Sequence, residues 1–270
     1  MNLYQEIYAA CKDKNSDLLN AMVNRQIELL IQTSLSFNKK LLDAPKPASL
    51  HWTAAAQLAY EGDEESLDFL KQYDIEHSQI FRGYAKQKNY AKIAKRSDAE
   101  LKDWIACGFA EAGDHESVEF YRTHYKSNPS LIACGYVEGG YHSEAEAYIA
   151  LHHVSPSLLA RNHARKGNDE WVKHYENNYA NHIFLPHIIL GALEGNNFML
   201  AAQYYAKQKI SMPELVKLYK QAHPDTSGEE VKEFEELIQR FAHQEHSSKF
   251  FHKKTDKKQE VASFHNPSII

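Results

Sequence analysis

Three cysteines, sixteen histidines and many carboxylates are the residues of this 270-residue chain that could do chemistry. Cys107 and Cys134 stand 27 residues apart, at equivalent positions of two similar stretches. A nucleophilic thiol is not expected to recur at such an interval, whereas a small apolar side chain that packs between helices is. We therefore interpret both as core residues. With Cys11 they make an odd, sparse set, which predicts no disulfide framework and favours a reducing cytoplasm.

The histidines and carboxylates do not stand at the spacing of a known site. His152 and His153 are adjacent, and His243 and His246 are three residues apart, so neither pair matches H-E-x-x-H or a mixed Cys/His motif. The acids gather near expected helix starts, where they complement the helix dipole. Phosphate-loop, dinucleotide and serine-nucleophile motifs are absent from the sequence. The sequence thus predicts no metal and no cofactor, and it favours a protein that is not an enzyme.

Tyrosine is the residue type whose spacing points most directly to a function. Tyr121, Tyr148 and Tyr175 recur every 27 residues, and Tyr125 and Tyr179 follow two of them by four residues. In a stack of repeated units, such rings would form a ladder. The ladder could be a partner-binding groove, because tyrosine is favoured at interaction hot spots. It could equally be packing between neighbouring units, with the hydroxyls in water.

A block of basic residues supplies a second candidate binding surface. The stretch from Arg82 to Arg96 holds six cations, including Lys92, and no acid, whereas residues 61–76 are mostly acidic. In a linear array these blocks would become neighbouring patches. They could pair with each other, or Arg82, Lys92 and Arg96 could bind an acidic protein or a lipid head group. The net charge of −5 indicates no general affinity for nucleic acid.

An internal repeat must position these candidates. GFAEAGDHESVEFY, beginning at Gly108, is restated as GYVEGGYHSEAEAY, beginning at Gly135. Aligned on the turn, the repeat steps by 26, 25, 27, 27 and 28 residues through Gly62, Lys88, Gly113, Gly140, Gly167 and Gly195. A glycine there would take the left-handed conformation that ends a helix, and the Asp or Asn after it would cap the next helix. A small residue three positions earlier would let helices approach closely. Each unit is then two short helices that must stack on their neighbours.

The sequence therefore predicts an all-α fold, an α-solenoid of helix-turn-helix repeats of about 26–27 residues with longer helices as a C-terminal cap. The expected parts are an N-terminal cap of degenerate repeats, the regular array, C-terminal capping helices and a disordered tail, at residues 1–50, 51–209, 210–246 and 247–270. No stretch reaches the roughly 18 apolar residues of a membrane span, and the N-terminus lacks a signal-peptide pattern. We expect a cytoplasmic protein.

The stretch AEAGDHESV, from Ala110 to Val118, resembles the helix-turn-helix core of an ankyrin repeat. The resemblance covers roughly residues 50–205, without the TPLHxA-type opening and without room for a β-hairpin. The paired helices are similar to tetratricopeptide units, although the period is shorter than their ~34 residues.

The chain resembles proteins that intracellular bacterial pathogens deliver into host cells. It shares with them a degenerate repeat array, a composition rich in Lys, Asn and His, and a polar tail. Glu229 to Glu233 is similar to the acidic block of type IV secretion signals, although farther from the C-terminus. This resemblance implies an alternative location in a host cytosol and, as partner, a host protein or a companion effector enzyme. The function we predict is a non-catalytic scaffold or regulator that binds a protein partner through the repeat surface. The alternative is an enzyme, or a regulator of a partner enzyme, with a site assembled across repeats.

Overall fold

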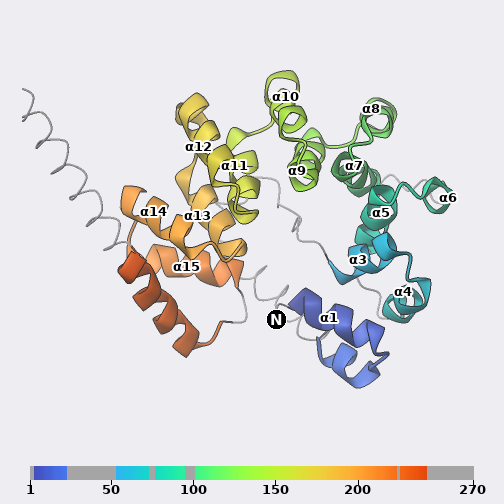
Figure 1. Ribbon diagram of the computed structural model, residues 1–270, viewed down its shortest axis with the longest axis horizontal. Coiled ribbons are helices and arrows are strands. Elements are labelled where there is room, and N and C mark those ends of the chain that lie inside the picture. Colours follow the sequence, from blue (N-terminus) through green and yellow to red (C-terminus); the bar gives the residue numbers. More distant parts are fainter. Residues whose placement is uncertain are drawn as a thin grey trace, which may run out of the picture.

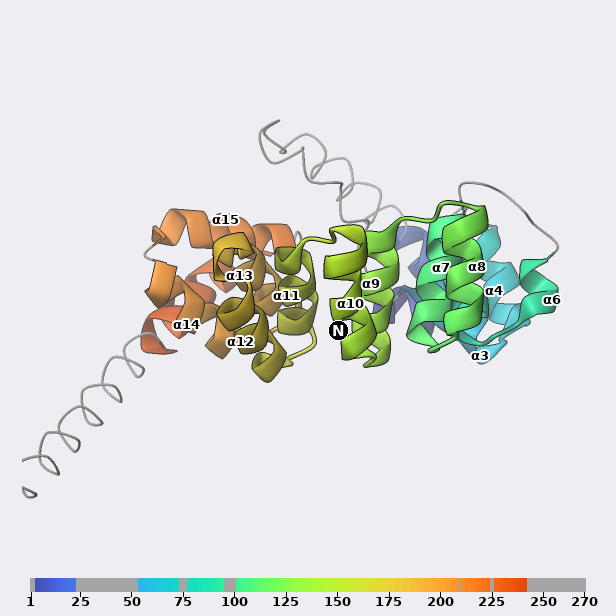
Figure 2. The same ribbon diagram turned by 90° about the horizontal axis from the view of Figure 1, so that it is seen from above.

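The computed structural model of the chain describes residues 3–22, 53–72, 77–94, 101–208, 210–223 and 226–241. Throughout these ranges the regular structure is helical, and no strand occurs in them. Figure 1 shows the helices in an inner and an outer row that follow an arc. Seen from above in Figure 2, they stand side by side, so that each unit contacts mainly its neighbours. The predicted all-α solenoid is confirmed.

The two rows alternate along the chain. The inner row consists of α3 (Ala54–Glu61), α5 (His77–Lys86), α7 (Lys102–Glu111), α9 (Pro129–Gly139), α11 (Pro156–Arg165), α13 (Leu185–Glu194) and α15 (Met212–Ala222). The outer row consists of α4 (Glu64–Lys71), α6 (Tyr90–Ile93), α8 (His115–His124), α10 (His142–His152), α12 (Asp169–Asn178) and α14 (Phe198–Gln208), and the short η2 (Ala180–His182) precedes α13.

The two ends of the array carry helices outside this alternation. α1 (Leu3–Lys12) packs against α3 and α4. Residues 16–22, which follow α1 in the sequence, form a further helix. At the other end, residues 228–241 form a helix whose Phe234 ring stacks on Tyr219 of α15 at 3.9 Å between ring centres. The predicted tail, 247–270, lies outside the described residues, as does most of the expected N-terminal cap. None of the helices that the structure describes is long and apolar enough to cross a membrane.

The turn inside the units has the backbone conformation that the repeat predicts. A left-handed conformation, with φ between 64° and 86°, occurs at Gly62, Gly113, Gly140 and Gly167. Lys88 adopts the same conformation, with a φ of 60°. The following residue then begins the next helix: the Asp63 carboxylate accepts a hydrogen bond from the backbone N–H of Ser66 at 3.1 Å.

The last turn lies one residue later than predicted. Gly195 has a φ of −89°, and the left-handed residue is Asn196, with a φ of 57°. Asparagine tolerates this conformation better than most residues, so a Gly-Asn pair can turn at either position. The turn residues are therefore Gly62, Lys88, Gly113, Gly140, Gly167 and Asn196.

Neighbouring inner helices approach so closely that some of their contacts leave no room for a side chain. Five residues before the turn residue stand Gly83, Gly108, Gly135 and Gly191. A Cβ atom on Gly108 would lie 2.3 Å from the carbonyl oxygen of Arg82 and 2.8 Å from Cβ of Ala85. Small residues thus set the spacing of the row, as predicted for Ala85, but the glycines carry the closest contacts. The unit of α11 has Asn162 at this position.

Candidate functional site

In the six units from α3 to α13, two positions lie nine and two residues before the turn residue. Both lie on the side opposite the residue four before the turn, whose ring at Phe109 and Tyr136 packs on the outer helix. Seven residues make about two helical turns, so both side chains lie on one face of the helix. We call the surface that they form the inner face. The first position is occupied by Thr53, Gln79, Trp104, Leu131, Leu158 and His187, and the second by Tyr60, Lys86, Glu111, Glu138, Arg165 and Glu194.

The middle of the inner face is an apolar row beside a charged row. Trp104, Leu131 and Leu158 are half-buried and pack against the core on one side. The charged row begins at Lys86, where an open pocket of about 530 Å³ lies at the C-terminal ends of α3, α5 and α7. Lys86 Nζ also lies 5.3 Å from the ring centre of Tyr60, which forms the edge of the face.

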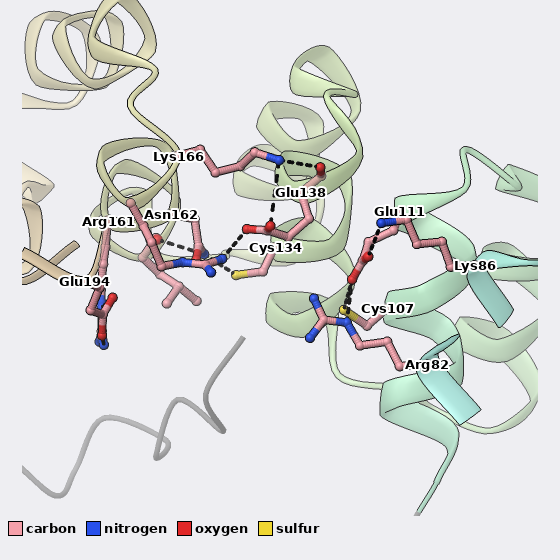
Figure 3. A network of polar contacts seen from close by, with 12 residues as sticks. Arg82, Lys86, Cys107, Glu111, Cys134, Glu138, Arg161, Asn162, Lys166 and Glu194 are labelled. Atoms are coloured by element: carbon pink, nitrogen blue, oxygen red, sulfur yellow. Dashed lines mark hydrogen bonds and ion pairs between the residues drawn. The ribbon is translucent and has the colours of Figure 1, made fainter. Parts of the chain in front are cut away.

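At one end of the charged row, α5 and α7 are joined by an enclosed ion pair (Figure 3). Arg82 Nε donates to a Glu111 carboxylate oxygen at 2.5 Å, and both side chains are fully buried. Lys86 Nζ lies 3.3 Å from the other Glu111 oxygen, and Cys107 Sγ lies 3.6 Å from the carboxylate. Burial of an unpaired charge costs several kcal/mol. In a buried ion pair, the attraction between the two charges roughly offsets that cost. The pair therefore works as a fixed connection between two units.

Toward the other end, α11 carries cations to both of its neighbours. Arg165 pairs with Glu138 of α9, and Lys166 Nζ lies 3.7 Å from the same carboxylate. Arg161 pairs with Glu194 of α13, where Nε donates at 3.2 Å. Figure 3 shows Lys166 turned toward Glu138, and Arg161 turned toward Glu194. The two arginines and the two glutamates are 11–14% exposed and Lys166 is 32% exposed, so solvent or a bound partner can reach them.

All three cysteines are buried and are unsuited to nucleophilic chemistry. Burial raises the pKa of the Cys134 thiol to about 12 and that of Cys107 well above its usual range. Because the thiolate is the reactive form, both thiols are inert near neutral pH. Cys11 is buried too, and its pKa is likewise raised to about 12 by burial. Within the described ranges, no group of three or more His, Cys, Asp or Glu side chains could hold a metal ion.

The first tyrosine column packs between the two rows of helices. Tyr148 and Tyr175 are buried and Tyr121 is half-buried. With the last turn placed at Asn196, the buried Tyr204 joins this column. Tyr204 OH donates to Glu176 at 3.0 Å, whereas the buried Tyr175 OH has no hydrogen-bond partner in the described structure. The rings of Tyr121, Tyr148 and Tyr175 thus pack on the inner helix of their own unit.

The second tyrosine column lies at the outer surface. Tyr125 is 38% exposed and lies 5.1 Å from Tyr121, measured between ring centres. Tyr179 lies 5.8 Å from Tyr175, and its hydroxyl donates to Glu146 at 3.1 Å. The predicted tyrosines are therefore brought together in pairs on α8 and at the end of α12. They lie on the outer helices, away from the inner face.

Of the predicted basic residues, the two that the structure describes, Arg82 and Lys92, do not share a surface. Arg82 is enclosed by its contacts with Glu111, and its guanidinium lies 5.8 Å from the ring centre of Trp104. Lys92 Nζ lies 3.0 Å from a Glu64 carboxylate oxygen at the start of α4. Arg96 lies outside the described residues. Cations of this block thus contact acids of neighbouring units.

Sequence reasoning missed the inner face, although its signal is present in the repeat. Read from the turn, the second position is Lys, Glu, Glu, Arg and Glu in five successive units, and the first is Trp, Leu and Leu in three. The fold and this two-row face define an α-solenoid, a protein built of stacked helical repeats. No protein-family model matches the sequence, and no curated protein or solved structure is significantly similar to it.

Proposed function

We propose that the chain is a non-catalytic scaffold that binds a protein partner on its inner face. The apolar row of Trp104, Leu131 and Leu158 beside the charged row is the observation that carries this proposal. Protein interfaces combine a desolvated apolar centre with a polar rim. Tryptophan and arginine are also the residue types most enriched at hot spots, and this face offers Trp104 and Arg165.

The geometry of the array favours a linear segment of the partner. Packed helices lie roughly 8–10 Å apart, and an extended chain advances by about 3.3 Å per residue. Every third residue of an extended segment would therefore meet one unit. Such a segment would place small apolar side chains over the apolar row and its own charges beside the partly exposed Glu138–Arg165 and Arg161–Glu194 pairs.

The experiment that tests this proposal is affinity capture with the full chain and two variants. The inner-face variant carries Leu131→Ser and Leu158→Ser. The matched control is Leu151→Ser on α10, where the side chain is 69% exposed at the outer surface. We expect the wild type and the control to retain the same partner and the inner-face variant to lose it. Loss of a hot-spot contact of about 2 kcal/mol weakens binding roughly thirtyfold.

Circular dichroism of each variant shows whether the array has kept its helices, so that lost binding is not mistaken for unfolding. A folded inner-face variant that keeps the partner would contradict the proposal. If Tyr125→Ala removes the partner instead, the outer tyrosine surface is the binding site.

The nature of the partner rests on the resemblances found in the sequence. In this proposal the chain acts in a cytoplasm, and the likeness to proteins delivered by intracellular pathogens makes a host protein or a companion effector enzyme the first partner to test. The ankyrin-like sequence of the turns supports a binding role.

A further inference from the structure

The unit of α11 and α12 differs from the three units before it, those of α5, α7 and α9, at two adjacent positions. Five residues before its turn it has Asn162 where four units have glycine, and the next residue is His163. The equivalent of His163 is aromatic in three other units, as Tyr84, Phe109 and Tyr136. Both departures lie where α11 meets the preceding unit of α9 and α10.

Asn162 loosens the contact between inner helices. Its Nδ2 donates to Cys134 Sγ of α9 at 2.8 Å and to the Leu158 carbonyl oxygen at 3.2 Å. The amide therefore occupies space where glycine elsewhere lets two backbones touch. In the described array, α9 and α11 contact each other less extensively than any other neighbouring inner helices from α3 to α13.

His163 is a fully buried imidazole with neither ring nitrogen hydrogen-bonded within the described structure. Its ring stacks on Trp171 of α12 with 5.5 Å between ring centres and lies 4.9 Å from His142 of α10. The polar rings at equivalent positions are satisfied: Tyr84 OH donates to Glu64 at 3.0 Å, and Tyr136 OH lies 3.1 Å from His115 Nδ1. A neutral imidazole leaves one N–H group without an acceptor here, whereas a charged one leaves two N–H groups and a buried positive charge without a partner.

The ionisable neighbours of His163 oppose its protonation. His142 faces it from α10, Lys166 from α11 and His174 from α12, and Tyr175 of α12 lies 5.4 Å away, measured between ring centres. Burial, followed by these three cationic groups, lowers the pKa of His163 to about 3.

Three acids on the elements around this site are already paired with cations or with His174. Glu146 of α10 contacts His174 at 2.8 Å, Glu138 of α9 pairs with Arg165, and Glu194 of α13 pairs with Arg161. The buried Cys134 of α9 faces the same helix. Among the described groups, none of those that shift the pKa of His163 is a carboxylate.

We propose that the junction of α10, α11 and α12 is an acid-sensitive joint, at which protonation of His163 separates the unit of α9 and α10 from that of α11 and α12. The imidazole is accepted only as the neutral form when the joint is closed, and it gains a proton when the joint opens. The stability of the closed state relative to the open state is therefore greatest above the ordinary histidine pKa of about 6.5, and it decreases as the pH falls below that value. For one proton, the population of the open state rises about tenfold per pH unit, until the pH reaches the pKa of the closed state. Opening at this place would bend the inner face.

Hydrogen exchange measured by mass spectrometry on the full chain tests the joint. After correction for intrinsic exchange rates, we expect protection of α10, α11 and α12 to fall roughly fifteenfold between about pH 6.5 and pH 5. Protection of α5, α7 and α8 should stay constant. His163→Phe, which places at this site the residue found at Phe109, should remove the pH dependence. His182→Gln, at an exposed position, should leave it unchanged.

Two further variants keep the result decisive. If the phenylalanine variant fails to fold, His163→Tyr, which imitates Tyr136, is measured in its place. Asn162→Gly should raise the protection of the joint at both pH values and leave its pH slope intact. Equal pH dependence in wild type and the His163 variant, or loss of protection spread evenly over the array, would overturn the proposal.

Discussion

Arg82 of α5 and Glu111 of α7 form an enclosed ion pair between two successive units, with 2.5 Å between Nε and the carboxylate oxygen. The same relationship returns three units along, between Arg161 of α11 and Glu194 of α13. In both cases the arginine stands six residues before one turn residue, and the glutamate stands two before the next. The period of the sequence therefore fixes the partners of its buried charges as well as its turns.

Removal of one partner of the enclosed pair should destabilise the array strongly. Arg82→Met leaves Glu111 buried with Lys86 as its remaining cation, and we expect a loss of about 3 kcal/mol in the free energy of unfolding. The double variant Arg82→Met, Glu111→Leu should recover most of this loss, because no buried charge is left. Urea denaturation of the wild type, of Arg82→Met, of Glu111→Leu and of the double variant provides the measurement. Strictly additive losses would show that the pair is not coupled.

A methyl group between α5 and α7 should separate two inner helices. In Gly108→Ala, the added Cβ would stand 2.3 Å from the Arg82 carbonyl oxygen, so the backbones must move apart. We expect a loss of about 1–3 kcal/mol, the usual cost of overpacking a core. Gly228→Ala is the matched control, since nothing lies within 4 Å of its Cβ position. If thermal melts rank the two variants equally, the close contact does not limit stability.

Two buried tyrosines of one column should respond in opposite ways to loss of the hydroxyl group. Tyr175 OH lacks a hydrogen-bond partner in the described structure, so Tyr175→Phe should stabilise the protein by up to about 1 kcal/mol. Tyr204 OH donates to Glu176 at 3.0 Å, so Tyr204→Phe should cost about 1 kcal/mol or more. Denaturation midpoints measured in parallel give the sign of each change. A loss in Tyr175→Phe as large as that in Tyr204→Phe would contradict the burial of an unsatisfied hydroxyl.

Much of the fold could be predicted from the sequence because the signals that start and end its helices are local. A glycine that ends one helix and an Asp that starts the next depend only on their own backbone, as at Gly113 and Asp114. The predicted position of the last turn, Gly195, is one residue too early. This error hides the fact that two further residues follow the repeat. Counted from Gly195, both Gly191 and Tyr204 fall out of their columns, whereas counted from Asn196 both fit.

The inner face could not be predicted in the same way, because its charges pair between units. A column of Lys, Glu, Glu, Arg and Glu reads as an ordinary solvated surface until the stacking is known. Arg82 looked like part of a basic patch, yet it lies fully buried against an acid 29 residues away. The burial of His163 was equally hidden, since an imidazole in an aromatic column gives no sign of whether it is hydrogen-bonded.

Photo-crosslinking from the two faces is the most direct test of the central claim, that the inner face binds a protein partner. A photoreactive residue replaces Leu131 on the inner face or Leu151 on the outer surface of the same full-length chain. We expect that one protein is crosslinked from position 131 and is not crosslinked from position 151. A partner that is crosslinked from position 151 and never from position 131 would contradict it.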